Sequence, residues 1–149
     1  MKEFSTTTTI RATPEAVWAI LTDAPGYANW NPEIKRLDAP RGVTLGEKIR
    51  AHVVLHGGKV QPVGVRVTAL EPPRRMVWTG GLPLGLFTGR RTFTITPVGG
   101  RDTGMVEFNL TLNFSGPLAG PIAGSLGDRQ PDIDALAAEL KAWVEKARV

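Results

Sequence analysis

The feature of this sequence that most constrains its fold is a segment near residue 110 in which apolar and polar residues alternate strictly. Val106, Phe108, Leu110, Leu112 and Phe114 are apolar, and each residue between them is polar. Successive side chains of a β-strand point to opposite faces of the sheet, so this segment predicts a strand with one buried and one solvated face. Such a strand requires a sheet around it and a second layer against its apolar face.

The same period of two runs through the chain from Ile34 to Ser115, in short segments. The glycine pairs Gly57-Gly58 and Gly99-Gly100 indicate tight turns between consecutive strands. An earlier segment, Phe4 to Ile10, is rich in threonine, which favours strands. Consecutive short strands joined by tight turns predict an antiparallel meander.

Two short helices are predicted between the first strand and the rest of the sheet. Thr13-Pro14-Glu15 has the composition of a helix start, because threonine caps, proline is tolerated at the first helical position and glutamate suits the helix dipole. This helix should stop near Thr22, and a second should end near Trp30. Asn31-Pro32 then breaks the helix, because the residue before proline avoids the α conformation.

A longer helix is predicted at the C-terminus. Its apolar residues recur at helical spacing and form one stripe: Ile133, Leu136, Ala137, Leu140 and Val144. Pro131 is incompatible with one unbroken helix from Leu118, because proline removes a hydrogen bond and clashes with the preceding turn. We therefore expect a kink, or a loose segment around residues 124–130 followed by a firm helix from about Pro131.

Length and composition exclude several classes of protein. The chain has 149 residues, which suits a single domain spanning 1–149, and it has no cysteine, which excludes disulfides and thiolate metal sites. With His52 and His56 as the only histidines, we predict no metal and no cofactor. No apolar run resembles a signal peptide or a membrane span, so we expect a cytoplasmic protein without membrane insertion. The net charge of +4 is scattered along the chain, which argues against nucleic-acid binding.

Several short motifs carry a resemblance to a known family. They are Thr13-Pro14-Glu15-Ala16-Val17-Trp18, Leu21-Thr22-Asp23, Tyr27, Trp30-Asn31-Pro32, Gly46, Glu71-Pro72-Pro73-Arg74-Arg75-Met76-Val77-Trp78 and Phe114-Ser115-Gly116-Pro117-Leu118. In order and spacing they resemble the polyketide cyclase/dehydrase and lipid-transport families of the START and Bet v 1-like (SRPBCC) superfamily. The resemblance implies an α+β helix-grip fold, in which a seven-stranded curved antiparallel sheet surrounds the long C-terminal helix and leaves a cavity for an apolar ligand. It implies no particular reaction, because the superfamily includes carriers, receptors, cyclases and a co-chaperone branch.

One charged residue, Arg91, is predicted to face this cavity. It lies two residues before Phe93, on the same face of its strand. Members of the resembled families often carry histidine at the position of Arg91 and glutamate at that of Leu112, a pair suited to proton transfer that this chain lacks. A guanidinium suits a carboxylate, so Arg91 is predicted to bind an acidic or carbonyl group of a ligand. The alternative is that Arg91 reaches solvent at the cavity mouth or pairs with a carboxylate of the protein itself, such as Asp128, Asp132 or Asp134.

The other predicted site residues are apolar. The predicted cavity residues are Arg91, Met76, Trp78, Phe93, Phe108, Leu110, Leu112, Tyr27, Trp30, Leu136 and Leu140, with core packing as the alternative for the apolar ones. A glycine- and proline-rich loop, GGLPLGLFTG, places Leu84, Leu86 and Phe87 close together. Large apolar residues in such a loop are unusual on a plain surface, so the loop is predicted to be a lid, a homodimer contact or part of the core.

The leading functional hypothesis is binding or carriage of a small hydrophobic molecule in the internal cavity. No residue is assigned a catalytic role. A cyclase or dehydratase is the alternative, and a buried carboxylate or tyrosine within reach of Arg91 would discriminate between the two. A co-chaperone-like domain is the third hypothesis, and it requires an exposed apolar patch with a basic rim.

Overall fold

The computed structural model describes residues 2–55, 58–99 and 104–146. Both predicted glycine turns include residues outside these ranges, at 57 and 100. In chain order the elements are β1 (Lys2–Ile10), α1 (Pro14–Leu21), α2 (Tyr27–Trp30), β2 (Ile34–Asp38), β3 (Lys48–Val54), β4 (Val60–Glu71), β5 (Arg75–Leu82), η2 (Pro83–Gly85), β6 (Phe87–Pro97), β7 (Val106–Ser115), α3 (Ala119–Leu126) and α4 (Gln130–Lys146).

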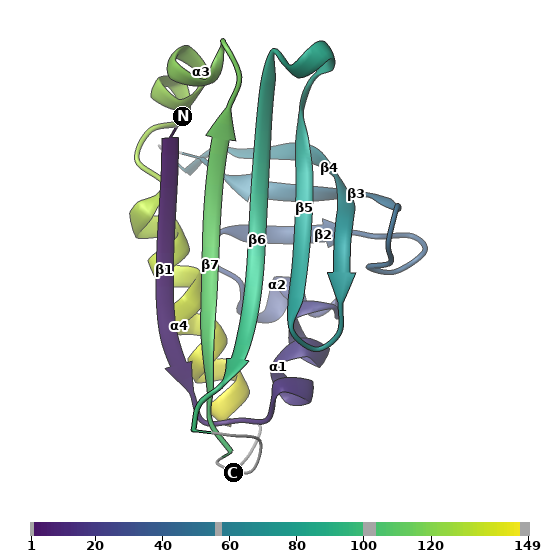
Figure 1. The fold of residues 1–149 in the computed structure, drawn as a ribbon, viewed down its shortest axis with the longest axis vertical. Helices are drawn as coiled ribbons and strands as arrows, with labels where there is room; N and C mark the ends of the chain where they lie inside the picture. Colours follow the sequence, from purple (N-terminus) through teal and green to yellow (C-terminus); the bar gives the residue numbers. More distant parts are fainter. Residues whose placement is uncertain (1, 56–57, 100–103, 147–149) are drawn as a thin grey trace.

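The strands form one seven-stranded sheet in the order β1-β7-β6-β5-β4-β3-β2, and all neighbours are antiparallel. In Figure 1, β1, β7, β6 and β5 run along the long axis, whereas β2 and β3 cross behind them. A bulge between Val67 and Ala69 interrupts the pairing of β4 with β5, and bulges bend strands and increase their twist. The predicted curved antiparallel sheet is confirmed.

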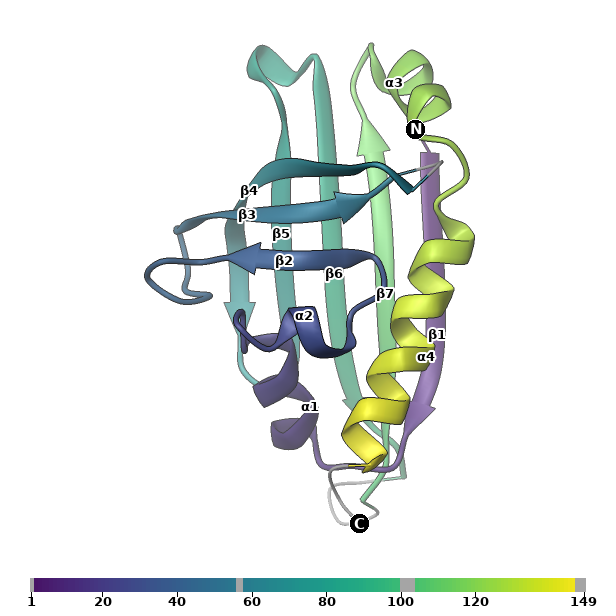
Figure 2. The ribbon, with the colours of Figure 1, turned by 180° about the vertical axis from the view of Figure 1, so that it is seen from behind.

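Helix α4 lies across the concave face of this sheet (Figure 2). The five residues of the predicted apolar stripe are all buried on it. Polar side chains of α4 also bind the sheet. Gln130 donates a hydrogen bond to the backbone carbonyl of Ser5 over 2.8 Å, and Lys141 donates one to that of Thr9 over 2.7 Å. These bonds satisfy carbonyl groups on the free edge of β1, which would otherwise invite pairing with another chain.

The helix is interrupted before Pro131 as predicted, but over a shorter segment than residues 124–130. Helix α3 ends at Leu126 and α4 begins at Gln130, so the break occupies residues 127–129. Pro131 falls in the first turn of α4, where its missing N–H costs no helical hydrogen bond. Thr13 caps α1 as predicted, accepting a hydrogen bond from the backbone of Ala16 over 3.2 Å. Among the described residues, no helix has the length and apolar character needed to span a bilayer.

Two turns meet at the end of the molecule where α3 lies, and we call their exposed leucines the leucine tip: Leu82, Leu84, Leu86 and Leu118. The backbone N–H of Leu118 donates a hydrogen bond to the carbonyl of Leu86 over 2.9 Å, which ties the β7–α3 turn to the β5–β6 hairpin. Gly116 makes this approach possible. Its φ is +100°, and a Cβ there would lie 2.7 Å from the carbonyl oxygens of Gly85 and Leu86.

Replacing Gly116 with alanine should therefore destabilise the protein by about 1–2 kcal/mol, because the side chain meets both a strained φ and backbone oxygens. Gly120 in α3 has open space around its Cα, so Gly120→Ala should be neutral or stabilising by up to about 1 kcal/mol. Urea unfolding of the two variants measures the contrast. Equal effects would contradict the close approach of the two turns.

Candidate functional site

A cavity of about 240 Å³ lies between the crossing strands of the curved sheet, close to the break between α3 and α4. Its walls are mainly aliphatic and aromatic side chains, with glycines of β5 and β6 between them. The residues that line it are Glu33, Ala51, Val53, Leu55, Val63, Val65, Trp78, Gly80, Gly81, Phe87, Gly89, Arg90, Arg91, Leu112, Phe114, Ile122 and Arg129. Val63 and Gly81 are exposed, so the cavity opens to solvent on this side.

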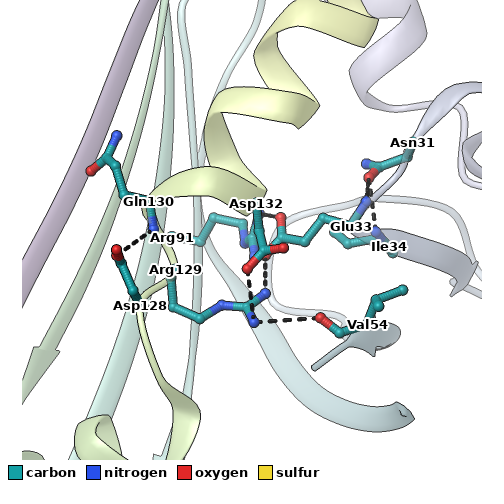
Figure 3. A network of polar contacts seen from close by, with 9 residues as sticks. All are labelled: Asn31, Glu33, Ile34, Val54, Arg91, Asp128, Arg129, Gln130 and Asp132. Atoms are coloured by element: carbon teal, nitrogen blue, oxygen red, sulfur yellow. Dashed lines mark hydrogen bonds and ion pairs between the residues drawn. The ribbon is translucent and has the colours of Figure 1, made fainter. Parts of the chain in front are cut away.

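The polar end of the cavity is an ion cluster in which Glu33, Arg91 and Arg129 are buried and line the cavity, whereas Asp132, whose side chain is 38% exposed, joins the cluster from outside the lining (Figure 3). Both terminal nitrogens of Arg91 donate to the Glu33 carboxylate, Nη1 to Oε1 and Nη2 to Oε2, each over 2.8 Å. Nη2 of Arg129 donates to the same Oε2 over 2.9 Å. The side chain of Glu33 is fully buried, and those of Arg91 and Arg129 are only 13% and 5% exposed.

Three separate parts of the chain hold this cluster in place. Glu33 lies between α2 and β2, where the side-chain oxygen of Asn31 accepts hydrogen bonds from the backbone N–H groups of Glu33 and Ile34, over 2.9 and 2.8 Å. Arg91 extends from β6, and Arg129 from the break before α4. Figure 3 shows these side chains converging from the sheet and the helix.

Arg129 has two further acceptors besides Glu33. Its Nη1 lies 3.2 Å from a carboxylate oxygen of Asp132 and donates to the carbonyl of Val54 over 3.4 Å. Two cations therefore meet two anions in the cluster, and the four charges sum to zero. Because each charge has a partner of opposite sign, the cluster avoids most of the free-energy cost of removing an unpaired charge from water.

The electrostatics of the cluster keep both members of the central pair charged. Burial alone would raise the pKa of Glu33, but the charges and hydrogen bonds of Arg91 and Arg129 outweigh burial and hold that pKa below its ordinary value. Burial would lower the pKa of Arg91, and the carboxylate of Glu33 more than offsets this, so that the pKa is raised. Glu33 is thus a weak base and a poor proton donor near neutral pH.

The sequence pointed to Arg91 but not to its partner. Arg91 is inward-facing and paired with a carboxylate of the protein, yet the suggested partners Asp128, Asp132 and Asp134 are not bonded to it in the described residues. Asp132 contacts Arg129, whereas Asp128 and Asp134 accept hydrogen bonds from Gln130. Sequence reasoning missed Glu33 and Arg129. Both lie in short connections, where no strand or helix pattern indicates whether a side chain points inward or outward.

The predicted cavity residues divide between the cavity and the core. Arg91, Trp78 and Leu112 line the cavity. The others are buried but lie outside the lining: Met76, Phe93, Phe108, Leu110, Tyr27, Trp30, Leu136 and Leu140. The reason is that α1, α2 and α4 cover that half of the concave face (Figure 2). Ring centroids of Tyr27 and Trp30 are 5.3 Å apart, and those of Trp78 and Phe93 are 4.9 Å apart.

The predicted lid residues also divide. Phe87 lines the cavity and stacks on Phe114, with ring centroids 5.7 Å apart. Leu84 and Leu86 face solvent, and Leu84 is 96% exposed at a φ of 62°. Helix α3 contributes Ile122 to the lining. The leucine tip therefore sits directly outside two residues of the cavity wall.

A second hollow lies on the surface beside α2 and β2. Its volume is about 690 Å³, and its lining includes Pro25, Arg36, Leu37 and Pro40. Its charged residues, Arg36 and Asp38, are not buried, and Leu37 is the one large aliphatic side chain in its lining. We therefore take the cavity beside Glu33 as the candidate site. No group of three potential metal ligands occurs among the described residues.

Comparisons with known proteins agree with the fold. The model of a family described as polyketide cyclase / dehydrase and lipid transport matches residues 1–145. A search of curated proteins found no match. Among solved structures, a START superfamily protein from Mycobacterium smegmatis is 22% identical with a TM-score of 0.69, covering 97% of this chain and 98% of its own.

Two further structures superimpose over nearly the full length. The Zhui aromatase/cyclase from a Streptomyces species is 16% identical with a TM-score of 0.76, covering 99% of this chain and 96% of its own. A protein from Thermus thermophilus is 22% identical with a TM-score of 0.71, covering 99% of this chain and all of its own. At these identities the likeness establishes the fold and not the activity.

Glu33→Gln should destabilise the protein by about 3–5 kcal/mol, because it removes the charge that neutralises two buried arginines. The matched control is Asp38→Asn, since Asp38 pairs with Arg36 and His52 at the surface and should lose far less. Urea unfolding at neutral pH measures both. Similar losses for the two variants would contradict a cluster on which stability depends.

The contribution of Glu33 should also depend on pH. Its folded pKa lies below the ordinary value of 4.5, so the stabilisation is complete above that value and is lost as pH falls through the lowered folded pKa. The difference in unfolding free energy between the native protein and Glu33→Gln should therefore shrink in acid. Urea unfolding across a pH series tests this, and a difference that stays constant or grows in acid would exclude it.

Proposed function

Because this chain belongs to the polyketide cyclase / dehydrase and lipid transport family, we propose that it binds and carries a small hydrophobic molecule in the cavity beside Glu33. The observation that carries the proposal is the composition of the cavity. Val53, Val65, Leu112 and Phe114 are among its walls, and its buried charges are gathered into one neutralised cluster. A concave, mainly apolar site with a few fixed polar groups is typical of small-molecule binding.

The polar groups near the cavity favour binding over acid–base catalysis. A general base works best with a pKa near the operating pH, whereas the pKa of Glu33 is lowered and its oxygens already accept three hydrogen bonds. Tyr27 is no better placed, because burial raises the pKa of its hydroxyl, which donates to the carbonyl of Leu21 over 2.6 Å. A buried carboxylate, that of Glu33, does lie beside Arg91, as the cyclase alternative requires. Its lowered pKa, however, does not suit a general acid or base near neutral pH.

In this proposal the leucine tip covers the entrance of the cavity. Phe87 directly follows Leu86 at the start of β6, Ile122 lies in α3, which directly follows Leu118, and both line the cavity, so a movement of the tip with these neighbours would open one wall. The tip also offers the exposed apolar surface that a co-chaperone-like domain needs. A pull-down that returned one stoichiometric protein partner would favour that alternative.

Filling the cavity should abolish binding. Val63 lines the cavity from β4, so Val63→Trp should weaken the binding of naphthalene by at least about tenfold, because the new ring occupies the ligand's space. Val60 lies on the same strand and outside the lining. Val60→Trp is the matched control and should bind naphthalene like the native protein.

Equilibrium dialysis with naphthalene measures both affinities, and thermal unfolding checks that both variants are folded. Equal binding by the native protein and Val63→Trp would place the ligand elsewhere and overturn the proposed site. Absence of saturable binding to the native protein would overturn the proposed function.

A further inference from the structure

The outer face of the crossing strands β3 and β4 carries three exposed basic residues, Lys48, Arg50 and Arg66, which we call the basic patch. We propose that this patch is a docking surface for an acidic segment of a partner protein. The sequence gives no sign of it, because its members are separated along the chain and only strand pairing brings them together. The inference is independent of the ligand proposed for the cavity.

The three residues share one face of the sheet. Exposed and buried residues alternate along β3, and the buried ones are Ile49, Ala51 and Val53. Lys48 and Arg50 lie between them and therefore point outward. Arg66 stands directly opposite Lys48 in the antiparallel pair and so shares its face. In Figure 2, β3 and β4 lie in front of the long strands, which places this outer face toward the viewer.

Gly64 lies at the centre of the basic patch. It stands directly opposite Arg50 and two residues before Arg66 on the same strand. A Cβ at Gly64 would lie 3.5 Å from Cε of Lys48, so the end of the lysine side chain reaches over this glycine. Three cations therefore surround one exposed stretch of backbone that no side chain covers.

The acidic residues closest to the patch along the neighbouring segments have other partners. Asp38 stands opposite Arg50 in β2, but its Oδ1 accepts a hydrogen bond from Arg36 over 2.6 Å and its Oδ2 lies 2.8 Å from Nε2 of His52. Glu47 precedes Lys48, and its carboxylate lies 3.9 Å from Arg41. Neither carboxylate forms an ion pair with the patch.

The charges of the patch are left without counter-charges in the described part of the chain. Lys48 and Arg50 take part in no ion pair or side-chain hydrogen bond there, and the side chain of Arg66 donates to the backbone carbonyl of Gly46 over 2.6 Å. Like charges directly opposite one another in a sheet are destabilising, and Lys48 and Arg66 are such a pair. A carboxylate from a partner would relieve this repulsion.

The spacing of the cations suits carboxylates on an extended chain. Alternate residues of a strand are about 7 Å apart, which is the distance between Lys48 and Arg50 along β3 and also that between alternate side chains of an extended peptide. The planar fork of an arginine matches the two oxygens of a carboxylate. An extended segment with acidic residues at alternate positions therefore fits the patch.

Two other anionic partners fit this face less well. Single-stranded nucleic acids stack their bases on aromatic side chains, and β2, β3 and β4 contain no phenylalanine, tyrosine or tryptophan. Attachment to a membrane surface needs large apolar side chains beside the cations, whereas the outward neighbours of the patch are His52, Pro62 and Gly64. The observations favour an acidic protein segment.

The test uses a fluorescent peptide in which glutamate alternates with serine, titrated by fluorescence anisotropy. The native protein should bind it saturably at low ionic strength and more weakly in about 0.15 M salt, because exposed charges are screened. Lys48→Glu should weaken binding about fivefold or more, because it replaces an attractive charge by a repulsive one. The same variant should raise the midpoint of thermal unfolding, because a carboxylate then stands opposite Arg66.

Lys146→Glu is the matched control. Lys146 is exposed in the last turn of α4, so its reversal changes the net charge by the same amount and should weaken peptide binding by less than about twofold. Equal losses in the two variants, or an unchanged affinity in Lys48→Glu, would overturn the basic patch as the docking surface.

Three further outcomes are decisive. Absence of saturable peptide binding to the native protein at low ionic strength would overturn the inference. Tighter binding of duplex DNA or of phosphatidylserine vesicles than of the peptide, lost in Lys48→Glu, would overturn the assignment of the partner as an acidic protein. A lower unfolding midpoint in Lys48→Glu would contradict the repulsion between Lys48 and Arg66. None of these results alters the naphthalene test of the proposed function.

Discussion

The contact between Glu33 and Arg91 is the interaction on which the rest of the site depends. It joins the segment after α2 to the centre of the sheet, and Arg129 extends it to the start of α4. These segments are far apart in sequence and meet at the polar end of the cavity. An ion pair in this position costs desolvation, so its stability comes from complete pairing: Glu33 is held by two arginines, and Arg129 by a second carboxylate.

The cavity follows from how the sheet and helices share the concave face. Helices α1, α2 and α4 cover one half, where Met76, Phe93, Phe108 and Leu110 are buried in the core. Over the other half the helical layer is interrupted at residues 127–129, and the crossing strands β3 and β4 form the facing wall. Pro131 and Gly127 cause this interruption. Proline is tolerated in the first turn of a helix but not in its interior, and the φ of +78° at Gly127 cannot continue a right-handed helix. The break that places Arg129 in the cluster also leaves room for a ligand.

Much of the fold could be predicted, because its strands and helices follow regular patterns of apolar and polar residues. Alternation from Val106 to Phe114 identified the strand and its buried face, and the helical stripe from Ile133 to Val144 identified what covers it. The site was predictable only where a residue belongs to such a pattern. Arg91 interrupts an apolar face, which predicted a partner in a ligand, in solvent or in a carboxylate of the protein. The chain has fourteen acidic residues, and neither Glu33 nor Arg129 lies in a strand or helix that assigns it to a face. The division of the apolar face into cavity and core depends on helix placement, which sequence spacing does not specify.

The central claim is that the space beside the neutral ion cluster receives an apolar ligand, and methyl NMR during a naphthalene titration tests it most directly. Methyl resonances of Val53, Val65 and Leu112 should shift and saturate together, because these residues line the cavity. Those of Leu37, in the second hollow, should remain unchanged. Saturable shifts confined to Leu37 and its neighbours, or no saturable shifts at the cavity, would contradict the account.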